Sequence, residues 1–158
     1  MGNHRILARG LATVACWLIG AACSRPVGVG AHGSTGSIRV THAVAWSAAD
    51  VKAATVGMEI SNGSDVFDTL IAVTSPAGAA MLHSEMAGQG MRPLPVLPLA
   101  PRASIRMGRG LHVMVESLKD APATGGTIPL TLRFARGGSM DLSVPVLRYS
   151  EALTALGE

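Results

Sequence analysis

The chain has 158 residues, of which 48% are hydrophobic and 15% are charged; this balance predicts one folded domain plus targeting sequence and excludes global disorder. The net charge of +3 includes Arg5 and Arg9, and removing these two from the 13 basic residues leaves 11 against 10 acidic residues. Since there is also no run of Lys or Arg, the composition argues against nucleic-acid binding.

Residues 1–23 are typical of an export signal. Arg5 and Arg9 give a positive start, and residues 10–22 form an apolar stretch of signal-peptide length, too short for a comfortable membrane span. Residues 20–23, Gly-Ala-Ala-Cys, are similar to a lipobox, in which Cys23 is lipidated and becomes the mature N-terminus. We expect an exported protein held by a lipid anchor on the periplasmic or extracellular face of the cell membrane, with plain signal cleavage or a retained anchor as alternatives.

Residues 24–37 are rich in Gly, Ser and Pro, which predicts a flexible tether. His32 lies in this segment and is interpreted as an exposed linker histidine. No cysteine follows Cys23. The rest of the chain therefore has no disulfide framework, thiolate zinc site or cysteine nucleophile.

From residue 38 onward, short apolar runs alternate with turn residues, as in Leu130, Leu132 and Phe134 with polar residues between them. Many short strands at this spacing predict an all-β antiparallel sandwich or barrel. We assign residues 38–149 to this domain and residues 150–158 to a C-terminal tail that contains one short turn of helix. The predicted strands are residues 38–46, 53–61, 69–75, 79–85, 103–107, 111–118, 127–135 and 140–147, and the helical turn is 151–156.

Two groups of histidine and methionine stand out in this cysteine-free domain. His112 and Met114 are two residues apart in a predicted strand, so their side chains share one face. His83, Met86 and Met91 lie in or just after another strand. Imidazole and thioether are borderline to soft donors that suit Cu(I), and thioethers neither titrate nor form disulfides outside the cell.

The other methionines and histidines have simpler interpretations. Methionine in an apolar strand usually fills gaps in the core, and we expect Met58, Met81 and Met140 to lie in or near the core, with Met107 either there or near the site. His42 lies in the first predicted strand and is interpreted as structural.

The segment from His83 to Met114 resembles the signature of the PCu(A)C periplasmic copper chaperones. Met91-Arg92-Pro93 is similar to the family's Met-Arg-Pro step, and His112-Val113-Met114 is similar to its His-x-Met. The resemblance extends over residues 38–147. The spacing between His83 and Met91 is shorter than in the family, so Met86 is kept as a substitute or additional ligand.

This resemblance implies a cupredoxin-like Greek-key β-sandwich that binds one Cu(I). The implied ligands are His83, Met91, His112 and Met114. The implied partners are the cytochrome c oxidase subunit that carries the Cu(A) centre and a thioredoxin-like assembly protein. Residues 149–158 contain no His or Met, so we predict no second metal site in the tail.

The expected role is binding and delivery, not catalysis. No Ser-His-Asp arrangement, paired catalytic acids or phosphate loop occurs in a supporting context. Two alternatives remain open: a copper buffer or scavenger at the cell surface that uses the same site, and a metal-free, lipid-anchored sandwich for adhesion or protein contact.

Overall fold

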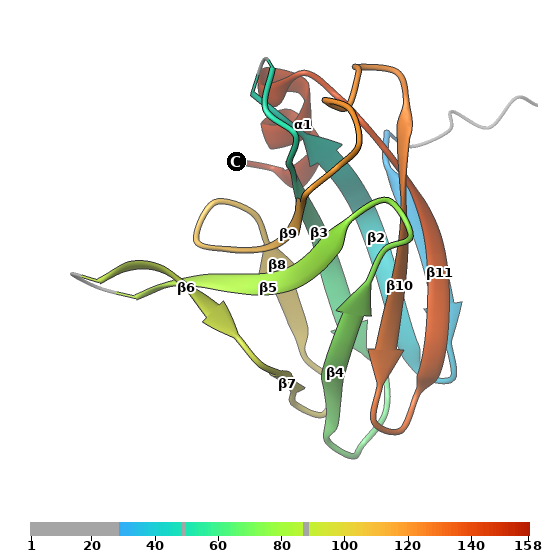
Figure 1. Cartoon of the computed structure of the whole chain (residues 1–158). Helices are drawn as coiled ribbons and strands as arrows, with labels where there is room; N and C mark the ends of the chain where they lie inside the picture. Colours follow the sequence, from blue (N-terminus) through green and yellow to red (C-terminus); the bar gives the residue numbers. More distant parts are fainter. Residues whose placement is uncertain (1–28, 49, 87–88) are drawn as a thin grey trace, which may run out of the picture.

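Two packed β-sheets and one helix make up the described part of the chain, which is residues 29–48, 50–86 and 89–158 of a computed structural model (Figure 1). The seven-stranded sheet has the order β1-β2-β3-β9-β5-β6, with β8 also paired to β3, and the four-stranded sheet has the order β11-β10-β4-β7. The strands are β1 (Ala31–Thr35), β2 (Ile38–Trp46), β3 (Ala54–Asn62), β4 (Asp68–Thr74), β5 (Ala79–Met86), β6 (Gly90–Leu94), β7 (Leu97–Leu99), β8 (Ser104–Met107), β9 (Leu111–Glu116), β10 (Thr127–Phe134) and β11 (Gly138–Pro145), and the helix is α1 (Tyr149–Leu156).

The core lies between the two sheets and is formed by the alternating apolar residues of each strand. In β10, Leu130 and Leu132 are buried while Arg133 is exposed. In β3, Val56 and Met58 are both fully buried against this layer. The all-β sandwich predicted from the sequence is confirmed, and each predicted strand corresponds to an observed one with ends that differ by a few residues at most.

The predicted tether, residues 24–37, is wrong for its last part, because Ala31–Thr35 form strand β1. β1 pairs with β2 and packs against β11. At Gly33, a side-chain Cβ would come within 2.6 Å of the Met140 sulfur. A small residue is therefore needed for close packing here, and the glycine-rich composition had suggested flexibility instead.

The region after His83 is also more regular than expected. Residues 90–94 form β6, an edge strand paired with β5, and residues 97–99 form β7 in the other sheet. This stretch has three prolines: Pro93 in β6, Pro95 in the short gap and Pro98 in β7. Proline is tolerated at sheet edges, because its missing N–H is not needed there, and this hid the strands from sequence analysis.

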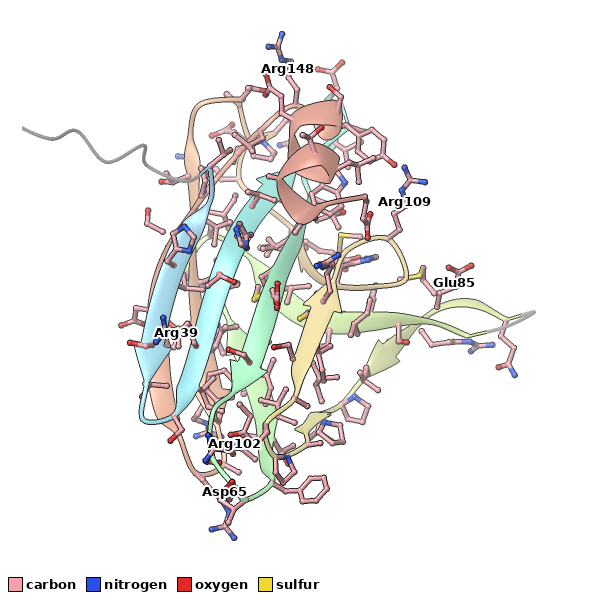
Figure 2. The ribbon with its side chains drawn as sticks, turned by 180° about the vertical axis from the view of Figure 1, so that it is seen from behind. Arg39, Asp65, Glu85, Arg102, Arg109 and Arg148 are labelled. Carbon is pink, nitrogen blue, oxygen red and sulfur yellow. The ribbon has the colours of Figure 1, made fainter. Side chains whose placement is uncertain are left out.

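The C-terminal segment, predicted as a tail, packs on the domain through α1. Ala152 and Leu156 are buried against Val44 and Trp46 of β2. They cover part of the outer face of the seven-stranded sheet, which we define as the face turned away from the four-stranded sheet (Figure 2). Gly57 permits this approach, since a Cβ there would lie 2.5 Å from the Leu156 side chain.

In the part of the chain that the structure describes, no helix has the length and apolar character needed to cross a membrane. The predicted signal segment and Cys23 lie outside the described residues.

Candidate metal centre

The two histidines singled out in the sequence lie side by side on neighbouring strands. In the antiparallel pairing of β5 with β9, His83 is directly opposite His112, and Met81 is directly opposite Met114. Directly opposed residues share a face of the sheet. The two imidazole rings have centroids 6.0 Å apart and an interplanar angle of 58°.

These side chains point to the outer face. On β9, Val113 and Val115 are fully buried in the core between the sheets. Because successive residues of a strand alternate between faces, His112 and Met114 must face the other way. Met114 also contacts Thr55 of β3, whose hydroxyl lies 3.9 Å from the Met114 sulfur.

Met91 reaches the same face from the edge strand. In the β5–β6 hairpin it is opposite Glu85, two residues along β5 from His83, so Met91 and His83 share the outer face. Met91 is 38% exposed. The backbone of Met86 pairs with Gly90 in this hairpin; the Met86 side chain lies outside the described part of the structure.

His112 is held in one tautomer by the backbone. Its Nδ1 lies 3.2 Å from the carbonyl oxygen of Gly108. A carbonyl can only accept a hydrogen bond, so Nδ1 carries the proton of the neutral ring and Nε2 carries a free lone pair. Nε2 is buried and has no hydrogen-bond partner in the described structure. A buried polar atom without a partner is costly, and a metal bond would satisfy this one.

The pKa of His112 is lowered, chiefly because burial disfavours the charged imidazolium. The hydrogen bonds from the ring to Gly108 and Arg109 oppose this effect, and the nearby His83 adds to it. His112 as a whole is 7% exposed. His112 is therefore kept neutral, which is the state in which imidazole binds a metal.

The loop at residues 108–110 positions this ring. β8 and β9 both pair antiparallel with β3, and the loop projects between them. The loop is closed by Gly108 N donating to Leu111 O at 2.6 Å, and it is tied to β5 by Glu85 N donating to Gly110 O at 2.7 Å. Arg109 lies 3.7 Å from the Glu158 carboxylate, which connects the loop to the end of α1 (Figure 2).

A solvent-accessible pocket reaches Met114 from the side of β2 and β3. It has a volume of about 460 Å³ and is lined by Met114, Thr55, Trp46 and Tyr149, among others. Met114 is thus reached from this pocket, whereas the His112 Nε2 is enclosed.

Comparisons with known proteins follow the same lines. Residues 37–146 match the LpqE-like family, a lipoprotein family by its description. The chain belongs to the LpqE-like family. No protein with curated annotation matches the chain.

Solved structures similar to this LpqE-like chain are PCuAC domains. The copper-bound PCuAC domain from PmoF2 has a TM-score of 0.65 and 21% identity, and the match covers 74% of this chain and 97% of that one. The apo PCuAC domain from PmoF1 has a TM-score of 0.63 and 24% identity over 73% and 97%. The CuI-DR1885 structure from Deinococcus radiodurans has a TM-score of 0.55 and 23% identity over 82% and 84%. The cupredoxin-like fold and the PCu(A)C resemblance are confirmed.

The donor set of this LpqE-like chain is soft. Among the described residues, no group of three or more His, Cys, Asp or Glu side chains is placed to hold a metal. Around His112, the outer face offers the two imidazoles of His83 and His112 and several thioethers, which suit a soft monovalent ion better than Ca²⁺, Mg²⁺ or Mn²⁺.

Met81, which we expected in or near the core, is a further candidate ligand because it faces away from the core between the sheets. Met81 is only partly buried and shares the outer face with His83. The sequence pattern that indicates this was present, because Met81 and His83 have the same two-residue spacing as His112 and Met114. Met58 and Met140 are in the core as predicted, and Met107, left open, is there too.

Proposed function

We propose that this LpqE-like protein is an extracytoplasmic Cu(I) metallochaperone that binds one ion. The proposed ligands are His83, Met91, His112 and Met114. The observation that carries the proposal is the orphaned Nε2 of the buried, neutral His112, which has His83 directly across the strand pair. Two of the similar solved structures are described as copper-bound, which supports the choice of metal.

The chemistry of these ligands favours Cu(I) over divalent ions. Thioethers are soft and neutral, so they stabilise a soft, singly charged ion and do little for hard ones. Binding without thiolates is also weaker, and a carrier has to release its ion. Because thioether sulfur has no proton to lose, binding through it persists in acidic surroundings.

The proposal also names the recipient of the copper and the location of the protein. The recipient is the Cu(A) centre of cytochrome c oxidase, with a thioredoxin-like partner that assists assembly. The protein is exported and tethered to the outer side of the cell membrane through lipidated Cys23, in line with the lipoprotein description of its family.

Equilibrium competition with a colorimetric Cu(I) chelator tests the binding site. We expect the wild-type protein to take one Cu(I) from the chelator. The double variant His112→Ala, Met114→Ala should leave the Cu(I) on the chelator. A matched control is Met140→Leu, which changes a buried core methionine of the other sheet. Unchanged affinity in the double variant would refute the ligand assignment, and absence of Cu(I) uptake by the wild type would favour a metal-free adhesion protein.

The delivery step needs a separate measurement. In a strain that lacks this protein, we expect Cu(A) loading of cytochrome c oxidase to fall, and we expect the wild-type gene to restore it. The double variant should fail to do so. A cell-surface copper buffer would leave oxidase loading unchanged while the purified protein still binds Cu(I), so this result would reject delivery and leave copper binding in place.

A further inference from the structure

A second pair of histidines faces outward at the opposite edge of the same sheet. His32 of β1 and His42 of β2 have ring centroids 5.6 Å apart with an interplanar angle of 73°. Both residues are exposed. β1 and β2 lie at one end of the seven-stranded sheet, and β5 and β6 at the other (Figure 1), so this pair is separate from the His83–His112 pair.

A β-bulge brings the two rings together. Ala31 pairs with Ala43 and Gly33 pairs with Val40, so His32 alone on β1 faces two residues on β2. His42 is one of these two residues, and its backbone has a φ of 54°.

A positive φ is unusual for a residue with a side chain and costs free energy. The neighbouring chain is also shaped to fit. Gly30 has a φ of 127°, and a Cβ at this position would lie 3.0 Å from the backbone of His42. The strained bulge is thus held by close backbone contact, and bulges of this kind re-aim side chains at functional sites.

The ring separation suits a shared metal ion. Cu(II), the ion considered below, prefers ligands at about 90° or 180° in a square plane. With metal–nitrogen bonds of about 2.0–2.1 Å, two ring centroids then lie roughly 4.5 Å apart in adjacent positions and roughly 6.4 Å apart in opposite ones. The observed 5.6 Å lies between these values, so a small rotation of the two side chains reaches either arrangement. The rings are inclined and not stacked, and both side chains are exposed, so the imidazoles are free to turn their nitrogen atoms toward a common ion.

The surroundings supply a partly charged pocket. His42 lines a cavity of about 230 Å³ together with Glu59, Arg106 and the last residues of α1, including Leu156 and Gly157. The carbonyl end of a helix favours a cation, and Glu59 adds a negative charge that offsets Arg106. In the described ranges, no third His, Cys, Asp or Glu joins the pair as a ligand, so water would complete the coordination.

We propose that His32 and His42 chelate one Cu(II) ion. Imidazole binds borderline divalent ions well, and Cu(II) heads the affinity order of the first-row divalent metals. No thioether takes part, which sets this site apart from the Met-rich group around His112 that suits Cu(I). The two sites would therefore hold the two oxidation states of one metal on the same face, and this inference does not depend on whether Cu(I) binds.

The test uses the full chain in detergent, with His83→Ala and His112→Ala as background. The chain has 5 histidines, so His4, His32 and His42 remain in this background. Cu(II) is titrated as its sulfate and followed by EPR and by paramagnetic broadening of histidine ring signals in NMR. His32→Ala and His42→Asn are then compared with the background. Asn is chosen because it tolerates a left-handed backbone, so the bulge is kept.

In the background protein, we expect one equivalent of Cu(II) to bind, to show nitrogen hyperfine splitting in EPR, and to broaden the ring signals of His32 and His42. In either variant, we expect Cu(II) to bind about tenfold or more weakly, because each substitution removes one of two ligands. Ser34→Ala, on the same face of β1, should bind as the background does. The proposal is overturned if either substitution leaves the affinity unchanged, or if His4 is broadened and His32 and His42 are not.

Discussion

The two halves of the proposed Cu(I) site differ in how firmly the fold holds them. His112 lies on β9, inside the sheet, and is 7% exposed, with its ring fixed by Gly108. Met91 lies on β6, at the edge of the sheet, and is 38% exposed. One half is thus preorganised and the other is accessible, which suggests that a recipient begins to take the ion by displacing the exposed thioether.

The largest effect is expected from the buried half. His112→Ala should lower Cu(I) affinity by about 100-fold or more, because even outer-sphere partners of metal ligands are worth roughly 10- to 100-fold. Chelator competition measures this loss, and thermal unfolding followed by circular dichroism checks that the variant folds. A smaller loss of Cu(I) affinity in His112→Ala than in Met91→Leu would contradict the assignment of His112 to the firmly held half of the site.

The exposed half should matter less. We expect Met91→Leu to lower Cu(I) affinity by about tenfold, near 1.4 kcal/mol, and to speed release of the ion to a competing chelator. Met81→Leu is the matched variant, since Met81 sits opposite Met114 on the same face. A greater loss with Met81→Leu would move the fourth ligand from β6 to β5. Equal losses would indicate that both sulfurs share the role.

The buried half should also make the metal-free protein sensitive to acid. Burial lowers the pKa of His112 in the folded state, whereas in the unfolded chain the pKa of a histidine is about 6.5. Below this value the unfolded state takes up a proton that the folded state resists. His112 therefore contributes to stability above pH of about 6.5, and this contribution is lost as the pH falls below it.

Urea denaturation of the metal-free protein over pH 7.5 to 5 measures this effect. We expect the decline of the free energy of unfolding to be steeper in wild type than in His112→Ala. Parallel declines in the two proteins would assign the acid sensitivity to other groups.

The smallest effect concerns the support of the loop at residues 108–110. Glu158→Gln weakens the contact with Arg109, a pair whose Arg109 side chain is 65% exposed. Exposed ion pairs are worth about 0–1 kcal/mol, so we expect a change in Cu(I) affinity of about twofold and little change in stability. Glu151→Gln, which breaks the ion pair with Arg148, is the control and should leave affinity unaltered. A tenfold loss with Glu158→Gln would show that His112 is less firmly held by β9 than its burial indicates.

The sequence by itself determined the strands and the donor chemistry. Strict alternation, as in Leu130, Leu132 and Phe134, reveals a half-buried strand because side chains alternate with a period of two. The same rule placed His112 and Met114 on one face. It would have placed Met81 beside His83 as well, had methionine not been interpreted as a core residue. The absence of cysteine after Cys23 restricted any soft site to thioether and imidazole.

Only the tertiary structure decided which strands are neighbours. The pairing of His83 with His112 joins residues that are far apart in the chain, and this register depends on how both sheets bury their apolar faces. The same holds for β1, whose Gly33 looks like tether sequence until Met140 is seen packed against it. The bulge that aims His42 at His32 is likewise set by pairing across strands. Side-chain chemistry and alternation are local properties of a sequence, whereas register and burial come from contacts between distant segments.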